Sequence, residues 1–391
     1  MKKVLIFSLA YYPNFVSGAE AAIKEITDRI DQKDIEFYMV TLLFDKAQKK
    51  EELMGNVHVH RVGFGGAYIS KILFIPLAAL KARVLDKKYK FNAIWAMMTY
   101  MLLPTVISRL FGIRAPHILT LQDGDPYEKV FNRWFILPIV PVLDYGFRTA
   151  SMVQAISVFL AKWPQKRGYK GPIELIYNGA NPRDIKDAVS AEEVEEMKKK
   201  LGKKPGDIFL VNTSRLVHQK AFDDIIRALV KLPKNIKLLA VGTGSDEKIL
   251  KKLAEDLSVS DRVIFTGHVD RGVVTLYRRA SDIFVAPSRS EGLGNAFISA
   301  LASRLPLIAT QVGGMADYVF DEKHNPGKQP TAWVIDPDSP DQISEKVKEI
   351  IANPEKAKQI STFARKMVEE KYDWDNIARD MHKKVFNRIT S

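Results

Sequence analysis

Residues 286–309 read APSRSEGLGNAFISALASRLPLIA. A short apolar run ends near Pro287, a turn that contains Glu291 and Gly294 follows, and an apolar helical pattern begins at about Asn295. A helix that starts directly after such a turn presents backbone N–H groups at its N-terminus, which suit phosphate or sugar oxygens. Glu291 stands at the carboxyl end of the strand, where open α/β sheets bind ligands, so it is either a ligand-binding carboxylate or a helix cap.

The same order of strand and helix continues on both sides of this stretch. Amphipathic segments at 223–230, 246–257 and 341–351 separate short apolar, β-branched runs. An alternation repeated this often predicts parallel sheets with helices on both faces, and the number of runs predicts two such sheets in succession. The predicted strands are residues 4–9, 37–43, 57–62, 93–98, 117–121, 152–156 and 173–177, followed by 208–213, 236–241, 263–266, 283–286, 305–309 and 331–335.

The division between the two sheets is predicted from a change in composition. At 391 residues the chain suits two domains. The charged segment SAEEVEEMKKKLGKK, residues 190–204, follows the last strand of the first sheet and has the pattern of a helix that opens a second unit. We therefore predict a first domain at residues 1–180 and a second at 181–371, with residues 372–391 forming a last helix.

The composition excludes several classes of site. The chain has no cysteine, so disulfides, thiolate nucleophiles and cysteine-ligated metal centres are impossible. The first ten residues hold too short an apolar run for a signal peptide, and no window reaches the ~18 apolar residues of a membrane-spanning helix. We expect a cytoplasmic protein.

Positive charge is concentrated in the first half of the chain. The formal net charge is +13, from 59 Lys and Arg against 46 Asp and Glu, and residues 1–175 hold 24 of the basic and 15 of the acidic residues. This excess favours either an anionic partner, such as a phosphorylated substrate, an acidic lipid surface or a nucleic acid, or simply a well-solvated surface.

One segment of the first half combines apolar and basic residues at helical spacing. Between Ile69 and Lys90 apolar residues recur every three or four positions and basic residues gather toward the end, while Pro76 would kink the helix or mark its start. An apolar and aromatic patch follows at Trp134. This combination suits peripheral contact with an anionic membrane; the alternative is a core-facing helix with a solvated basic end.

Two further loops carry candidate binding residues. SRLVHQK at 214–220 follows a strand and places Arg215 and Lys220 five positions apart, so both cations can converge on a diphosphate and stabilise negative charge on a leaving group. YYPNFVSGAE at 11–20 is the first strand-to-helix loop, in which Gly18 either permits close approach to a ligand or makes a turn. Each loop is a weak signal by itself.

Together these segments resemble the retaining glycosyltransferases of family 4, which have the two-domain GT-B fold. The resemblance covers almost the whole chain and is strongest at residues 208–319. The Arg and Lys that hold the donor diphosphate in the family match Arg215 and Lys220. The remaining matches are Glu291-Gly292-Leu293-Gly294, Gly313-Gly314 before Asp317, Phe265-Thr266-Gly267, Asn178-Gly179, a half-kept Gly18-Ala19, and Tyr372-Asp373-Trp374 in the tail that returns to the first domain.

The resemblance implies a GT-B fold of two Rossmann-like, doubly wound parallel-sheet domains. It also implies transfer of a hexose from a nucleotide sugar to a glycan, lipid-linked or other hydroxyl acceptor, without a metal or another cofactor. The second domain would hold the donor, and the first would supply most of the acceptor site. Acceptor attack would occur on the face that the diphosphate leaves, and no enzyme nucleophile would be needed.

The same resemblance assigns roles to individual residues. Arg215, Lys220 and Glu291 would be catalytic, because the two cations face the leaving diphosphate and the carboxylate orients the hydroxyls of the donor sugar. The residues expected to contact the donor are Gly18, Ala19, Arg215, Lys220, Gly267, His268, Val269, Glu291, Gly292, Leu293, Gly294, Asn295 and Ser299.

Three positions depart from the family pattern. The Glu that holds the donor ribose in the family is replaced by Ser299, which would hold the nucleoside loosely, so that Ser299→Glu would tighten nucleotide binding. The first-domain His is replaced by Gln122, which together with Asp123 is expected on the acceptor side. Asn181 stands where the family has Asp.

Other interpretations of the chain stay open at this point. Loss of the family residues at Ser299 and Gln122 would fit a catalytically weak nucleotide-sugar-binding protein. The basic first half would fit a nucleic-acid-binding protein, but it lacks aromatic residues interleaved along a basic groove, so nucleic acid is not the expected partner. The loop at 241–244 lacks the third glycine of a dinucleotide site, and an epimerase would need acid–base residues that the sequence does not show.

Overall fold

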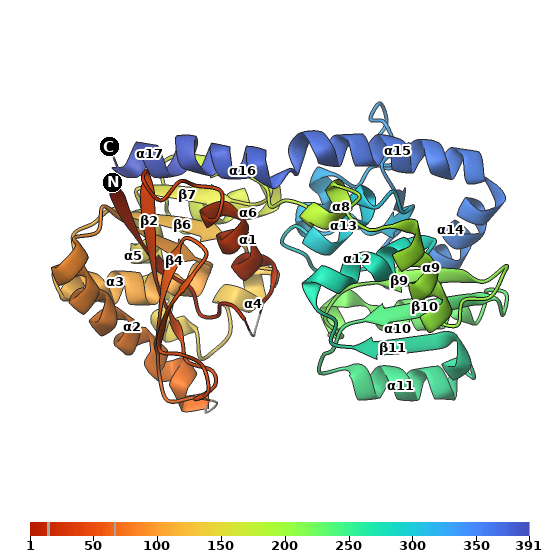
Figure 1. The fold of residues 1–391 in the computed structure, drawn as a ribbon, viewed down its shortest axis with the longest axis horizontal. Helices are drawn as coiled ribbons and strands as arrows, with labels where there is room; N and C mark the ends of the chain where they lie inside the picture. The colour runs from red at the N-terminus through yellow and green to blue at the C-terminus, as the bar shows by residue number, and fades with distance from the viewer. Residues whose placement is uncertain (14–15, 66–67, 391) are drawn as a thin grey trace. The chain divides into compact units, whose positions relative to one another are not determined.

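The computed structural model describes residues 1–13, 16–65 and 68–390, and it divides the chain into two compact units (Figure 1). Met1–Asn178 and Trp374–Ser391 form the first unit, and Gly179–Asp373 form the second. Each unit is built on one sheet, so the predicted fold of two Rossmann-like α/β domains is confirmed. The predicted boundaries at 180 and 372 lie two residues from these divisions.

The first sheet has eight strands in the order β3-β4-β2-β1-β5-β6-β7-β8. All seven strands predicted for this half of the chain are present, and they pair with one another in parallel. The strands are β1 (Lys2–Phe7), β2 (Ile35–Leu42), β3 (Glu51–Met54), β4 (Val57–Val62), β5 (Ala93–Met97), β6 (His117–Leu121), β7 (Met152–Ala155) and β8 (Ile173–Leu175).

The edge strand β3 is the one that the sequence analysis missed. Its four residues, EELM, include two glutamates, which are depleted in strands. Gly55 and Asn56 join β3 to β4, and Gly55 has a φ of +58°. A two-residue connection can only join antiparallel strands, so the first sheet is parallel except at this edge.

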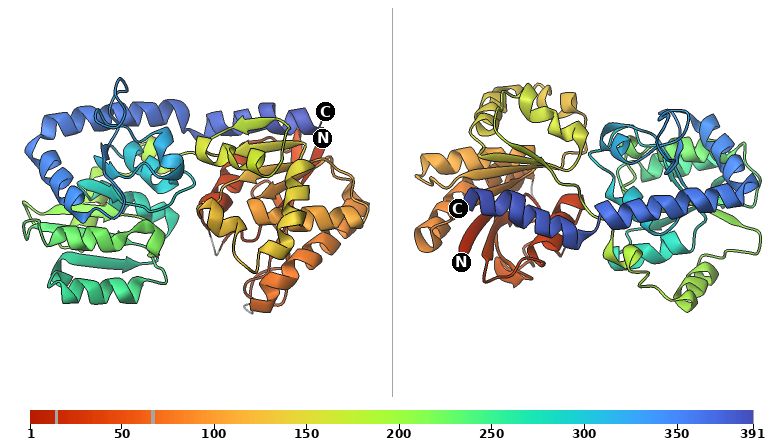
Figure 2. Two further views of the ribbon diagram at one scale, coloured as in Figure 1. Left: turned by 180° about the vertical axis from the view of Figure 1, so that it is seen from behind. Right: turned by 90° about the horizontal axis from the view of Figure 1, so that it is seen from above.

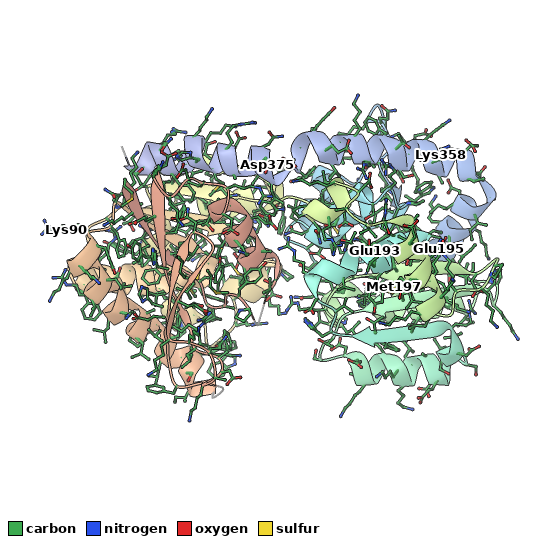
Figure 3. All side chains as sticks on the ribbon, in the orientation of Figure 1. Lys90, Glu193, Glu195, Met197, Lys358 and Asp375 are labelled. Carbon is green, nitrogen blue, oxygen red and sulfur yellow. The ribbon has the colours of Figure 1, made fainter. Side chains whose placement is uncertain are left out.

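Alternate residues of the central strand β1 face two different layers of helices. Val4 and Ile6 share a core with α1 (Gly18–Thr27) and with the C-terminal helix α16 (Trp374–Asp380). Arg29 Nε donates to Asp375 on α16 at 2.6 Å, so the last helix belongs to the first unit. Asp375 is labelled in Figure 3. The other helices and helical turns of this unit are α2 (Tyr68–Tyr89), η1 (Thr99–Met101), α3 (Leu102–Leu110), α4 (Tyr127–Phe131), η2 (Leu137–Ile139), α5 (Val140–Arg148), α6 (Val158–Ala161), α7 (Trp163–Lys166), η6 (Met381–Phe386) and α17 (Asn387–Thr390).

Helix α2 begins before the proline that was expected to kink it or to mark its start. It runs through Pro76 as 22 helical residues. A proline inside a helix costs about 3 kcal/mol because it removes one backbone hydrogen bond and crowds the preceding turn. Packing of α2 against β1, β2, β4 and α3 offsets this cost, which local sequence cannot reveal.

The second sheet has six parallel strands in the order β11-β10-β9-β12-β13-β14, and all six were predicted (Figure 2). They are β9 (Ile208–Asn212), β10 (Ile236–Val241), β11 (Val263–Gly267), β12 (Ile283–Ala286), β13 (Leu307–Ala309) and β14 (Trp333–Val334). One core joins the sheet to α10 (Phe222–Leu229), α11 (Glu247–Asp256) and α14 (Pro340–Ala352). A second group of helices packs together as α8 (Pro182–Ile185), α9 (Ala191–Lys200), α12 (Arg271–Arg279), α13 (Asn295–Ala302) and α15 (Pro354–Lys371).

Candidate functional site

Four loops of the second unit meet at one edge of its sheet. Residues 213–220 follow β9, 242–246 follow β10, 287–294 follow β12 and 310–317 follow β13. These strands are direct neighbours in the order β10-β9-β12-β13 and are parallel, so their carboxyl ends lie along the same edge. Ligands of open α/β sheets bind at such an edge.

An ion pair joins two of these loops. Lys220 Nζ donates to Glu291 Oε1, and Ser288 Oγ donates to the same oxygen at 3.2 Å. The side chains of Lys220 and Glu291 are 14% and 6% exposed. The structure therefore brings together two of the three predicted catalytic residues as a mostly buried ion pair.

The glycine pair after β13 holds the backbone of Glu291. Gly314 N–H donates to Glu291 O at 3.2 Å. Gly313 has a φ of +57°, and a Cβ at this position would lie 1.9 Å from the same carbonyl oxygen. Only glycine permits this approach, so the Gly313-Gly314 pair serves to position the Glu291 turn.

The turn that precedes α13 is fixed from behind by a buried tyrosine. Tyr318 Oη donates to Leu293 O at 2.8 Å, and Gly294, with a φ of +87°, leads into α13. Burial, assisted by the nearby Glu291 carboxylate, raises the pKa of Tyr318 well above its usual range, so the phenol stays a neutral donor. The N–H groups of Asn295 and Ala296, the first two residues of α13, lie beside this turn, whereas those of Phe297 and Ile298 donate to Gly294 O at 2.9 and 3.2 Å.

The loop after β10 supports the loop that carries Arg215. A Cβ on Gly242 would lie 2.4 Å from Ser214 O, and one on Gly244 would lie 2.0 Å from Leu216 O. These glycines therefore allow the two loops to pack closely. Arg215 itself is exposed, and no hydrogen bond or ion pair joins its guanidinium to another described residue.

The other predicted donor residues divide between this edge and the helix behind it. Gly267 is the last residue of β11, which lies next to β10; His268 and Val269 follow it, and the His268 side chain is 81% exposed. Ser299 lies inside α13 and is 5% exposed. Its Oγ accepts from Asn181 N–H at 2.9 Å and donates to Asn295 O at 2.9 Å, so both of its hydrogen-bonding roles are used within the unit.

In the first unit, Gly18 and Ala19 begin α1. Gly18 is exposed, Ala19 is buried, and a capping box of Ser17 and Glu20 closes the helix end, with Glu20 Oε2 accepting from Ser17 N–H at 2.7 Å. Asn14 and Phe15 of the predicted loop lie outside the described residues.

The predicted acceptor-side residues follow β6 in the first unit. Gln122 and Asn178 exchange two hydrogen bonds through their amides, at 2.8 and 3.3 Å. Asp123 is buried and accepts from Thr99 Oγ1 at 2.9 Å, and burial raises its pKa to about 6. Met98, just before Thr99, has φ +72° and ψ +159°, a strained conformation that is otherwise almost confined to glycine.

Sequence reasoning missed Tyr318 and Arg289. Arg289 pairs with Asp223 of α10 at 2.9 Å and bonds His218 O at 2.8 Å. Two acidic residues soon after Lys220 and an arginine soon before Glu291 were visible in the sequence. Their pairing was not, because 66 positions separate Asp223 from Arg289.

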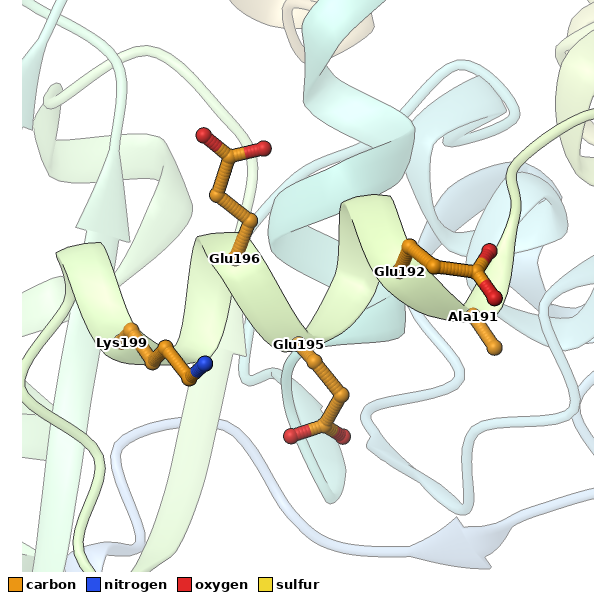
Figure 4. A pocket seen from close by; sticks show the side chains of 5 residues that line it. All are labelled: Ala191, Glu192, Glu195, Glu196 and Lys199. Carbon is orange, nitrogen blue, oxygen red and sulfur yellow. The ribbon is translucent and has the colours of Figure 1, made fainter.

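A pocket elsewhere in the second unit does not suit the same ligand. All five of its lining residues belong to α9, and three of them are the glutamates Glu192, Glu195 and Glu196, with Lys199 as the one cation of the lining (Figure 4). These carboxylates would repel a diphosphate. In the part of the chain that the structure describes, no three acidic or histidine side chains gather as metal ligands.

Comparison with known proteins fits this arrangement. Residues 193–367 match the model of the glycosyl transferases group 1. A glycosyltransferase of Methanocaldococcus jannaschii is 30% identical over 53% of this chain and 52% of its own length. A GDP-mannose-dependent alpha-(1-6)-phosphatidylinositol monomannoside mannosyltransferase of Mycobacterium tuberculosis is 27% identical over 63% of this chain and 64% of its own length. The chain thus spans about half to just under two thirds of these two relatives.

Solved structures share the fold. A sucrose-phosphate synthase from Thermosynechococcus elongatus matches with a TM-score of 0.86 at 18% identity, over 100% of this chain and 99% of that one.

Proposed function

We propose, on the match of residues 193–367 to the glycosyl transferases group 1, that this chain transfers a hexose from a nucleoside diphosphate sugar to a hydroxyl of a glycan or lipid-linked acceptor. The observation that supports this most is the edge of the second sheet, where the Lys220–Glu291 pair, exposed Arg215 and the N-terminus of α13 lie on adjacent loops. Cations and free N–H groups suit a diphosphate, and a carboxylate beside them suits sugar hydroxyls.

Each residue of this edge then has a defined task. Arg215 and Lys220 bind the diphosphate and stabilise the charge that grows on it as the bond to the sugar breaks. Glu291 accepts hydrogen bonds from the sugar hydroxyls and fixes their orientation. Ser214 Oγ, which is buried and has no hydrogen-bond partner among the described residues, supplies a further polar group beside Arg215.

We propose that the transfer retains the configuration of the sugar and needs no metal. The acceptor attacks on the face that the diphosphate leaves, and the leaving oxygen takes up the proton of the acceptor hydroxyl. Arg215 and Lys220 provide the positive charge that a bound cation supplies in metal-dependent transferases. Addition of EDTA should leave the rate unchanged, and a strict requirement for Mg²⁺ would contradict the proposal.

Two experiments test the proposal: the first identifies the donor, and the second tests the loop that carries Arg215 and Lys220. Thermal unfolding with UDP, GDP, ADP and their sugars should single out one donor, because a ligand at 100 times its dissociation constant adds about 2.7 kcal/mol of stability. Arg215→Ala and Lys220→Ala should then each lower turnover by about 10²–10³. Lys248→Ala, which removes an exposed lysine from α11, serves as the control. Unchanged rates in both loop variants would reject the assignment.

One observation favours a second candidate, a nucleotide-sugar-binding protein with little turnover. Gln122 stands where the resembling family has a histidine, and its amide is already engaged by Asn178. Nucleotide binding without measurable transfer to any glycan or lipid acceptor would support this candidate.

We also propose that the protein works peripherally at the cytoplasmic face of an anionic membrane. Helix α3 packs against α2 and α5 in the first unit; Leu110 at the end of α3 is 83% exposed, and Trp134, in the segment before α5, is 82% exposed. No described helix is long and apolar enough to span a bilayer. The exposed large apolar residues of α2, of α3 and of the segment that leads into α5 are Ile69, Ile72, Leu73, Leu80, Val84, Leu110, Trp134, Phe135 and Leu137.

Positive charge near these apolar residues favours an anionic membrane as their partner. Lys71, Lys87 and Lys88 are exposed on α2, and Lys90, labelled in Figure 3, is exposed directly after it. Apolar side chains bordered by lysines suit the acyl boundary and the headgroups of an anionic bilayer. A membrane partner also fits a lipid-linked acceptor, as named for the mycobacterial relative.

A further inference from the structure

Arg289 connects the two loops that carry Lys220 and Glu291. It stands two residues before Glu291, and its backbone N–H donates to Gln219 O at 2.8 Å. Its Nη1 donates to His218 O, also at 2.8 Å. Both carbonyls belong to the short helical turn that ends at Lys220, so Arg289 holds this turn directly.

The other N–H groups of Arg289 are taken by three carboxylates. Nη1 and Nη2 each donate to Asp223 at 2.9 Å, Nη2 also donates to Asp224 at 3.3 Å, and Nε donates to Asp338 at 2.6 Å. A guanidinium has five N–H groups, and these bonds together with the one to His218 engage all five. Arg289 therefore has no donor left for a ligand, which excludes direct binding of the substrate.

The surrounding charges keep this arrangement ionised at neutral pH. Burial acts to raise the pKa of Asp223, but the bidentate pair with Arg289 outweighs it and lowers this pKa. Burial and the neighbouring Asp223 raise the pKa of Asp224 to about 6. Hydrogen bonding to Asp223, and then to Asp338, raises the pKa of Arg289 itself.

The backbone beside Lys220 needs such support. Ala221 has φ +52° and ψ +41°, in the left-handed region that a residue with a Cβ rarely adopts. Such a conformation persists only where the surroundings over-determine it. Arg289 bonds to His218 and Gln219, which precede Ala221 in the chain, and to the start of α10, which follows it.

We propose that Arg289 is a positioning residue that holds Lys220 against Glu291 and thereby sets the lysine ammonium for the donor diphosphate. The role of Lys220 in donor binding rests on the proposed function. The placement of Lys220 by Arg289 is independent of that function and can be measured without any ligand.

Arg289→Lys is the informative variant, because it keeps the charge but leaves three donors without the planar fork. Trace acetylation of the full-length protein, read by mass spectrometry, should show the Lys220 amine about tenfold more reactive in this variant, since hydrogen bonds to charged groups are lost around its turn. Affinity for the nucleoside diphosphate, measured by calorimetry, should fall by about the same factor.

Arg262→Lys provides a matched control. The Arg262 guanidinium is also buried and donates to three backbone carbonyls, those of Leu229, Pro233 and Ile236, at 2.8–3.0 Å. Ile236 is the first residue of β10, so this arginine lies at the opposite edge of the sheet from the candidate site. Its variant should lower the unfolding temperature without changing the reactivity of Lys220 or the affinity for nucleotide.

A double-mutant cycle separates positioning from general destabilisation. If Arg289 acts through Lys220, then Arg289→Lys should have no further effect on nucleotide affinity in a Lys220→Met background. An unchanged reactivity of Lys220 in Arg289→Lys, or an equal rise in Arg262→Lys, would overturn the inference. Failure of the wild-type protein to bind any nucleoside diphosphate would reject the proposed function, while the labelling result would still decide the role of Arg289.

Discussion

At the scale of single residues, the ion pair of Lys220 and Glu291 leads to an unusual expectation. Glu291→Gln keeps the shape of the side chain but removes the countercharge of Lys220, whose ammonium then faces the diphosphate alone. Affinity for the free nucleoside diphosphate should rise by up to about tenfold, while turnover falls because the sugar hydroxyls lose a charged acceptor. Calorimetry and rate measurements test both parts, with Glu247→Gln on α11 as the control. Weaker nucleotide binding in Glu291→Gln would contradict this role.

A second residue-scale prediction concerns Asp123. Burial raises its pKa to about 6, so the folded state binds this proton more tightly than the unfolded state. The residue therefore stabilises the fold at acid pH, and this contribution is lost as the pH rises through about 6. Asp123→Asn keeps an oxygen for the Thr99 hydroxyl and removes the buried charge.

The free energy of unfolding should reveal the difference. The difference in unfolding free energy between Asp123→Asn and the wild type should shift in favour of the variant by about 2 kcal/mol when the pH is raised from ~4.5 to ~7.5. Urea unfolding at the two pH values measures this change. Asp125→Asn, whose carboxylate is 39% exposed and pairs with Lys129, is the neighbouring control. A stability difference that does not vary with pH would show that Asp123 stays ionised in the fold.

At the scale of elements, Ser299 ties α13 to the segment that enters the second unit. Ser299→Ala leaves the buried Asn181 N–H without an acceptor, which should cost about 1–3 kcal/mol of unfolding free energy. Ser361→Ala on α15 removes a similar buried hydroxyl that donates to the carbonyls of Ala357 and Lys358 in the preceding turn, and this variant should cost less because both carbonyls belong to the same helix.

Nucleotide affinity decides between the two roles of Ser299. If the hydroxyl acts only inside the unit, Ser299→Ala binds nucleotide as the wild type does, and Ser299→Glu loses stability because a carboxylate cannot fit a position that is 5% exposed. If the hydroxyl holds the ribose, as the resemblance implies, Ser299→Ala binds more weakly and Ser299→Glu more tightly.

At the scale of the whole molecule, the surface of α2, α3 and α5 predicts binding to lipid. The protein should sediment with anionic vesicles, less at high salt and not with neutral vesicles, because surface charges are screened. Replacing Lys87, Lys88 and Lys90 with Glu should weaken binding by at least about a hundredfold, since each lysine near an anionic surface contributes about 1 kcal/mol. The same change at Lys248, Lys251 and Lys252 of α11 alters the net charge equally and is the control. Equal losses in both triple variants would assign the effect to net charge.

Much of the fold follows from the sequence by itself. Thirteen of the fourteen strands, the two sheets and the loops after β9 and β12 were predictable, because apolar periodicity and glycine turns are local properties of the chain. The candidate residues Arg215, Lys220 and Glu291 follow strands by three, eight and five positions, and the resemblance to a known family assigned their roles.

Only the tertiary structure decided how these residues are held. Lys220 meets Glu291 across 71 positions, Arg289 meets Asp223 across 66, and Ser299 meets Asn181 across 118. The continuation of α2 through Pro76 and the pairing of the glutamate-rich β3 likewise depend on neighbours that are remote in sequence. Local patterns fix which segments become strands and helices, but which side chains satisfy one another is set only when parallel strands bring distant loops to a common edge.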